Sequence, residues 1–212
     1  MHTYLIAIVV ALSSLSQSVF GSAFAKLDFG GEIYIEIPRN WTVLDENLRN
    51  HLNTSSEAIT RLAGLPQSAN DNVILVAANA YTTFRTPSST LRLSVRRGQG
   101  ASQSDMAQVA RMPQAELQAA LAPIAEQSQK AMLGIDGVMS ATFLGSRVAS
   151  NKTLYCMFFE FETVVPDGTK ISQTYVCPYS TKTIKLSTSY RKSESAMFRP
   201  VIEQVWQSLN SK

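Results

Sequence analysis

Two cysteines are the residues whose spacing most directly suggests chemistry in this sequence. Cys156 and Cys177 lie on two segments of alternating apolar and polar residues that flank the turn-forming stretch Val165-Pro166-Asp167-Gly168-Thr169. Segments of this kind pair as a β-hairpin, so the two thiols lie on partner strands. In an oxidising compartment, a disulfide is the first interpretation.

The register of this hairpin leaves the thiol chemistry open. A three-residue loop with a bulge at Gly168 places Met157 opposite Cys177 and Cys156 opposite Pro178, so the cysteines point to opposite faces of the sheet. A bulge elsewhere in the hairpin brings them back into contact. The alternatives are therefore a bridge, two buried free thiols, or a redox-active pair that lacks the C-x-x-C spacing.

Nucleophilic and cofactor chemistry have little support in the sequence. Beyond His2 there is one histidine, His51. A serine or cysteine nucleophile needs an imidazole to accept its proton, and His51 is the one candidate outside the predicted leader. The Gly98-Gln99-Gly100 stretch lacks the third glycine of a dinucleotide-binding loop. We predict no catalytic residue and no cofactor, with a hydrolase using two carboxylates as a minor hypothesis.

Metal binding has one weak candidate. Glu160 and Glu162 lie two residues apart in the same predicted strand, so their side chains share a face. A metal site needs more ligands than this. A polar strand face in water explains the pair more simply, and we expect no metal.

Basic residues near the ends of two predicted strands are a candidate docking patch, made of Arg92, Arg96, Arg97, Lys182 and Lys185, with Arg191 and Lys192 nearby. A solubilising face with edge-protecting lysines is the simpler interpretation. The functional alternative is weak contact with an acidic partner or an anionic lipid headgroup. Nucleic acid is not an expected partner, because 19 basic against 16 acidic residues give a net charge of only +3.

The first 25 residues have the pattern of a signal peptide. An apolar run from Leu5 to Leu12 is followed by a serine-rich stretch and then by Ala23-Phe24-Ala25, an A-x-A cleavage pattern. The run is too short for a transmembrane helix, which needs about 20 residues. We therefore predict cleavage after Ala25 and a periplasmic or secreted protein without a transmembrane segment.

Residues 26–212 read as one globular domain, since their number suits a single hydrophobic core. Apolar residues with a period of two predict strands, and apolar residues at helical spacing predict helices. The predicted strands are 32–38, 73–78, 91–95, 138–149, 153–165, 170–179 and 183–190. The predicted helices are 45–63, 105–132, which Pro113 and Pro123 divide or kink, and 195–210.

This order of elements predicts the fold class. The connections between the late strands are too short for parallel crossovers, so the sheet must be mainly antiparallel. Several strands are apolar on both faces, so helices must cover both sides of the sheet. We predict an α+β fold, an α/β/α sandwich with a central, mainly antiparallel sheet flanked by helices.

Two short patterns carry a family resemblance. The corner Ile37-Pro38-Arg39-Asn40-Trp41 follows the first strand, and the closing helix has the form Phe198-Arg199-Pro200-Val201-Ile202. With the order of elements, they resemble the PsbP-like superfamily, which includes exported accessory proteins of the DcrB and PsbP types. The resemblance implies a PsbP-like domain and a non-enzymatic accessory or binding role, and it assigns no functional residue.

These observations favour an exported non-enzymatic accessory protein that docks onto an unknown envelope or secreted protein. The alternative is a carrier or sensor of a small apolar ligand or lipid, held in a pocket between the sheet and the helices. Methionine suits adaptable apolar sites, and five methionines are candidates to line such a pocket: Met106, Met112, Met132, Met139 and Met157.

Overall fold

The computed structural model describes residues 23–52, 72–83, 85–98 and 100–211. The predicted leader up to residue 22 and positions 53–63 of the first predicted helix lie outside these ranges. Within them, residues 46–52 are helical, as the sequence predicts for the start of that helix.

The strands and helices agree closely with the predicted order. The strands are β1 (Phe24–Phe29), β2 (Ile33–Pro38), β3 (Thr42–Val43), β4 (Asn72–Ala80), β5 (Ser89–Arg97), β6 (Ser140–Ser150), β7 (Tyr155–Val165), β8 (Gly168–Pro178), β9 (Lys182–Arg191) and β10 (Asn210–Ser211). The labelled helices are α3 (Gln103–Val109), α4 (Gln114–Leu133) and α5 (Ser195–Ser208), the last preceded by a 3₁₀ turn, Lys192–Glu194.

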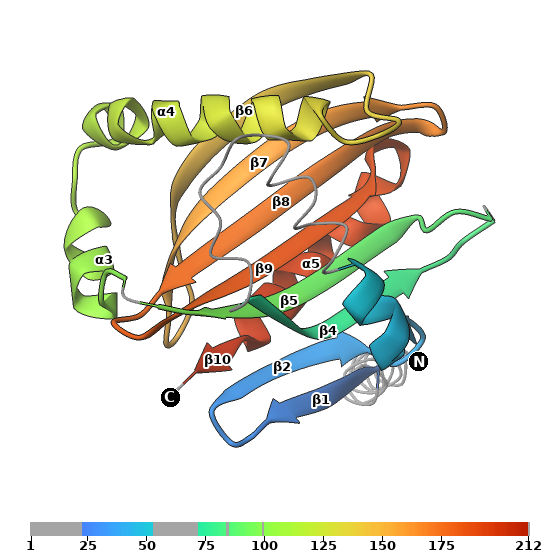
Figure 1. The fold of residues 1–212 in the computed structure, drawn as a ribbon, viewed down its shortest axis with the longest axis horizontal. Coiled ribbons are helices and arrows are strands. Elements are labelled where there is room, and N and C mark those ends of the chain that lie inside the picture. Colours follow the sequence, from blue (N-terminus) through green and yellow to red (C-terminus); the bar gives the residue numbers. More distant parts are fainter. Residues whose placement is uncertain (1–22, 53–71, 84, 99, 212) are drawn as a thin grey trace, which may run out of the picture.

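A seven-stranded sheet forms the centre of the molecule, in the order β3-β4-β5-β9-β8-β7-β6. Every strand pair in it is antiparallel, as predicted. A smaller sheet, β1-β2-β10, packs beside α5. Figure 1 shows α4 crossing one side of the large sheet and α5 lying on the other side.

Two neighbouring side chains of β7 show how the sandwich is built. Phe158 and Phe159 point to opposite faces, because side chains alternate along a strand. Phe158 belongs to the main core under α5, whereas Phe159 packs against Leu117 and Leu121 of α4. The sheet is therefore covered on both faces, which confirms the predicted α/β/α sandwich.

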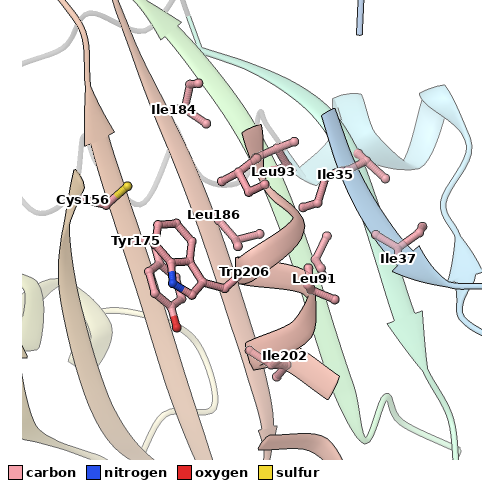
Figure 2. Packing of buried hydrophobic residues seen from close by; sticks show 14 of the residues in the cluster. Ile35, Ile37, Leu91, Leu93, Cys156, Tyr175, Ile184, Leu186, Ile202 and Trp206 are labelled. Carbon is pink, nitrogen blue, oxygen red and sulfur yellow. The ribbon is translucent and has the colours of Figure 1, made fainter. Parts of the chain in front are cut away.

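The main core lies between the large sheet, α5 and β2. Ile33, Ile35 and Ile37 of β2 are buried, as their alternation predicts. Figure 2 shows the central part of this core. The buried residues of α5 are Phe198, Ile202, Val205 and Trp206, and burial of each contributes about 1.5–3 kcal/mol to the hydrophobic stabilisation.

The two patterns that carry the family resemblance meet in this core. The Trp41 ring lies edge-on to the Phe198 ring, with centroids 6.2 Å apart. Both side chains are buried. The corner after β2 and the first turns of α5 therefore stabilise each other.

The two prolines of the second helical region have different effects. Pro113 is the N-cap of α4 and separates it from α3, whereas Pro123 remains within α4. At the start of α3, Ser102 and Asp105 form a capping box, in which each side chain accepts a hydrogen bond from the other's backbone N–H.

The predicted register of the β7–β8 hairpin is wrong by one residue. Val165 pairs directly with Gly168, so the loop is Pro166-Asp167 alone, and Met157 pairs with Val176 rather than Cys177. Gly168 has φ +125°, a conformation open to glycine, and this lets the strands close without the third loop residue. The shift brings the cysteines opposite each other, and Cys156 and Cys177 form a disulfide.

Strand β1 was not predicted. It begins at Phe24, inside the segment that the sequence analysis assigns to the leader, and its six residues pair with β2. Phe24, Leu27 and Phe29 pack against the main core. The leader pattern and the strand therefore overlap at Phe24 and Ala25.

Candidate binding cleft beside helix α5

A cleft of about 460 Å³ lies between the N-terminal half of α5 and strands β6, β7 and β8. This volume falls within the range of roughly 300–1,000 Å³ that is usual for small-ligand sites. The lining combines aromatic rings with charges of both signs: Arg147, Phe158, Glu160, Gln173, Tyr175, Ser195, Ala196, Arg199, Pro200 and Glu203.

Stacked side chains form one wall of the cleft and continue into the main core. The Arg147 guanidinium lies over the Phe158 ring, 3.9 Å from its centroid. The Phe158 and Tyr175 centroids are 4.8 Å apart, and those of Tyr175 and Trp206 are 4.3 Å apart. Because Arg147, Phe158 and Tyr175 are direct cross-strand partners, the sheet register holds the stack in place.

The Tyr175 hydroxyl is a polar group without a protein partner at this site. Its residue is only 1% exposed, and its hydroxyl accepts and donates no hydrogen bond within the part of the chain that the structure describes. Burial, followed by the negative charge of Glu203, raises the pKa of Tyr175. The hydroxyl therefore stays protonated at physiological pH and can both donate and accept.

Two carboxylates complete the polar part of the cleft. Glu160 Oε1 accepts from Gln173 Nε2 at 2.8 Å and from Arg199 Nη2 at 3.3 Å. Glu203, one turn after Arg199 on α5, accepts from Gln207 Nε2 at 2.8 Å. Tyr190 and the Glu160 carboxylate raise the pKa of Arg199, which keeps that guanidinium fully charged.

A second, shallower groove of about 570 Å³ follows the opposite flank of α5, against β2. Here Ser208 Oγ accepts from the Glu36 backbone N–H at 2.8 Å and donates to the Val205 carbonyl at 2.7 Å. Its hydroxyl is thus used to join α5 to β2. This groove offers no buried polar group comparable to the Tyr175 hydroxyl.

The predicted docking patch is divided between the two faces of the sheet. Arg97 pairs with Lys182, whereas Arg96 pairs with Thr183 one position away, so their side chains point to opposite sides. Arg92 and Lys185 share the face of Arg96, and Lys182 contacts Glu32 at 3.1 Å. The patch therefore consists of two smaller groups, and its role stays a prediction.

Arg92 and two basic residues near the patch have structural partners. Arg92 donates to the Ala78 carbonyl and to Asn79 Oδ1. Buried Arg191 joins the β7–β8 turn to the β4–β5 loop, because its Nη2 binds Asp167 Oδ2 at 2.7 Å and Thr86 Oγ1 at 2.6 Å. Lys192 pairs with Glu162 at 2.6 Å.

The other sequence candidates are also accounted for. Glu160 forms an ion pair with Arg199 and Glu162 forms one with Lys192. The described residues hold no group of three metal-ligating side chains. His51 lies in the helical segment 46–52, outside the cleft lining. Among the described helices, none is long and apolar enough to cross a membrane.

The disulfide belongs to the main core. Both cysteines are fully buried, and Figure 2 places Cys156 above Tyr175 on the side of the sheet that α5 covers. Thiol exchange requires access of an attacking thiolate to sulfur. The burial therefore favours a structural bridge over a redox-active pair.

The methionines do not converge on one pocket. Met132 and Met157 pack against the core under α4, Met106 is buried at α3, and Met139 is 62% exposed. The cleft lining contains no methionine. This cleft between the sheet and α5, as the described residues form it, is thus polar and aromatic, unlike the predicted apolar pocket.

Sequence reasoning singled out Glu160, as a weak metal candidate, but missed the cleft that this residue lines. Phe158 and Tyr175 come from different strands and meet only in the observed register, which the sequence analysis placed one residue off. Arg199 and Glu203 lie four residues apart on the polar side of α5, a spacing that puts both on one helix face. That spacing was the one available signal.

Comparison with known proteins identifies the fold. No protein-family model matches the sequence, and no curated protein matches it. Among solved structures, PsbP (CyanoP) from the cyanobacterium Synechocystis sp. PCC 6803 aligns with TM-score 0.51 and 10% identity over 92% of this chain and 96% of that one.

A second solved structure is LpqN, described as involved in cell envelope biogenesis of Mycobacterium tuberculosis. It aligns with TM-score 0.45 and 10% identity over 88% of this chain and 89% of LpqN. The cyanobacterial alignment, which spans nearly both chains, shows a shared architecture. This chain has the PsbP-like fold.

Proposed function

We propose that this chain is an exported, non-enzymatic accessory protein, and that a partner protein of the envelope or extracellular space docks into the cleft beside α5. The observation that carries the proposal is the Tyr175 hydroxyl, which reaches the cleft from a buried residue without a hydrogen-bond partner in the described structure. A typical hydrogen bond contributes about 0.5–1.5 kcal/mol net. A docked group that hydrogen-bonds to this hydroxyl gains a contribution of that size.

The composition of the cleft supports binding rather than catalysis. Ser195 Oγ donates to the Lys192 carbonyl at 2.5 Å, and no histidine lines the cleft to act as its base. Glu160 is held by Arg199 and Gln173, whereas a carboxylate-only hydrolase needs a carboxyl group that can give its proton to the substrate.

The leader pattern and the disulfide support export. Residues 1–25 have the features of a signal peptide with cleavage after Ala25, and stable disulfides form mainly in oxidising compartments. Both point to the periplasm or the extracellular space. The PsbP-like fold is compatible with an accessory role.

Two of the remaining basic residues provide a second, weaker contact. Arg96 and Lys185 share one face of the sheet and are exposed, and like-charged groups of this kind steer an acidic partner or an anionic surface toward a protein without adding much affinity. The small-ligand alternative requires a polar ligand, because arginine and glutamate side chains form the rim of the cleft.

Native mass spectrometry tests the proposal. The tagged protein would be purified gently from its own compartment and weighed first intact and then after denaturation. We expect a mature chain in the exported fraction that carries a partner protein lost on denaturation. A bare monomer, or a chain retained in the cytoplasm with its leader, would contradict the proposal.

A further inference from the structure

Hydrogen-bond acceptors without partners in the described ranges line the same cleft as the Tyr175 hydroxyl. Glu160 uses Oε1 for both of its hydrogen bonds, and Glu203 uses Oε1 for its bond from Gln207. The second oxygen of each carboxylate makes no hydrogen bond within the described ranges. With the Tyr175 oxygen, the cleft presents three acceptors to an incoming group.

The charged donors around the cleft are held on other partners. Arg199 of α5 is shared between Glu160 and Tyr190. Arg147 of β6 lies over the Phe158 ring. Gln173 of β8 donates to Glu160. Each of these donor side chains thus has a contact within the protein, whereas the three acceptor atoms have none within the described ranges.

The charged side chains that act on the Tyr175 hydroxyl also favour a cation. Glu203 and Glu160 raise the pKa of Tyr175, and Arg147 lowers it to a smaller extent than Glu203 does. Burial is the largest cause of the upward shift. The two carboxylates thus outnumber the one guanidinium that acts on this hydroxyl, which favours a positive group beside it.

We propose that the cleft binds an organic cation, the ammonium or guanidinium group of a basic side chain that the docking partner presents. This inference rests on the proposed function and names the chemistry of the docked group. An ammonium group has three N–H donors, as many as the acceptor atoms Glu160 Oε2, Glu203 Oε2 and the Tyr175 oxygen. The Phe158 and Tyr175 rings supply an apolar wall for the methylene stem of such a side chain.

Arg199 is a resident competitor for this site. Its side chain is 65% exposed, and its contact with Glu160 is 3.3 Å long, so the pair is a weak, solvent-screened one. A ligand cation at Glu160 Oε2 therefore competes at little cost with the Arg199 charge for this carboxylate. Removal of the Arg199 charge should therefore strengthen binding of a cation, whereas it should weaken binding of an anion.

The test is an NMR titration of the isotope-labelled mature chain with three blocked amino acids. The probe is N-acetyl-lysine N-methylamide, the neutral control is N-acetyl-norleucine N-methylamide, and the anionic control is N-acetyl-glutamate N-methylamide. We expect saturable shifts at Tyr175, Glu203 and the Trp206 indole N–H with the lysine probe alone. A fourth titration, with 1,5-diaminopentane, separates a protein side chain from a free small diamine as the source of the cation.

Two variants with opposite expected effects on affinity make the result specific. Glu203→Gln should weaken binding of the lysine probe by about 3- to 10-fold, the range expected for loss of one exposed charge-assisted hydrogen bond. Arg199→Gln should strengthen binding of the same probe. Glu126→Gln is the matched control, since Glu126 is an exposed residue of α4 paired with Lys130 and should leave the dissociation constant unchanged.

The outcomes separate this inference from the proposed function. Binding of the glutamate probe instead, or an Arg199→Gln variant that binds the lysine probe more weakly, overturns the cation assignment and leaves docking in the cleft in place. If 1,5-diaminopentane binds more tightly than the lysine probe, the cation comes from a free small diamine and not from a protein side chain. If no probe binds and Tyr175→Phe leaves the partner complex intact in native mass spectrometry, both the cation and the docking site are wrong.

Discussion

The rings of Tyr175 on β8 and Trp206 on α5 lie nearly parallel, with an angle of 14° and centroids 4.3 Å apart. Figure 2 shows this stack in the middle of the main core, with the Tyr175 hydroxyl pointing away from the cysteine end of the strand. One contact thus connects the packing of α5 to the polar group of the cleft. The position of the cleft depends on the stability of this part of the core.

Trp206→Leu should lower the free energy of unfolding by about 2–4 kcal/mol, because it leaves a cavity and removes the stacked ring. Trp206 is 2% exposed. Met197→Ala on the same helix is the control, since Met197 is 58% exposed and its truncation should change little. Urea denaturation measures both, and equal effects of the two substitutions would show that the stack does not hold α5.

Replacing both Cys156 and Cys177 with alanine should cost about 2–4 kcal/mol of stability, as expected for a bridge that closes a loop of this size. The cysteines lie 21 residues apart in sequence. Because both are fully buried, an alkylating reagent should label neither in the native protein, and reductant should act only after unfolding. Labelling of the unreduced, unfolded chain would show free thiols instead.

Asp167→Asn should remove part of the acid sensitivity of the protein. The Thr86 hydroxyl, with the Lys170 and Arg191 charges, lowers the pKa of Asp167. A carboxyl whose pKa is lower in the folded state stabilises the fold above its unfolded pKa of about 3.9 and loses that effect as pH falls through the folded pKa.

The difference in unfolding free energy between wild type and Asp167→Asn should therefore be largest near neutral pH and shrink in acid. Denaturation curves across this range measure it. Asp136→Asn serves as the control, because Asp136 is exposed in the turn after α4. A difference for Asp167→Asn that stays constant with pH would contradict the proposed role of this carboxylate.

The mature chain should begin at Lys26. Cleavage after Ala25 removes Phe24 and Ala25, which pair with Pro38 and Ile37, and leaves four residues of β1 on β2. Mass spectrometry of the N-terminal peptide decides the position. A mature chain that starts at Phe24 would keep the whole of β1 and place the cleavage after Ala23.

The large sheet and α5 could be predicted from the sequence because their patterns are local. Ile33, Ile35 and Ile37 alternate strictly, and the apolar residues of α5 recur at helical spacing. The observed β6–β9 strands begin and end within two residues of the predicted ones. Strand β1 escaped prediction because its first residues also satisfy the rule for a cleavage site.

The cleft could not be predicted because it depends on a single-residue choice of register. Whether the β7–β8 loop has two or three residues is decided by the conformation of Gly168, and a shift of one residue exchanges the faces of every side chain in a strand. Phe158 and Tyr175 become partners in one register only. The same choice brings Cys156 and Cys177 together.

The measurement that tests the central claim most directly is native mass spectrometry of three forms purified in parallel from their own compartment. These are the wild type, Tyr175→Phe, and Met197→Ala as the matched control on α5. We predict that wild type and Met197→Ala carry the same partner and that Tyr175→Phe, with the same stability, has lost most of it. Equal occupancy in all three would show that the cleft beside α5 is not the docking site.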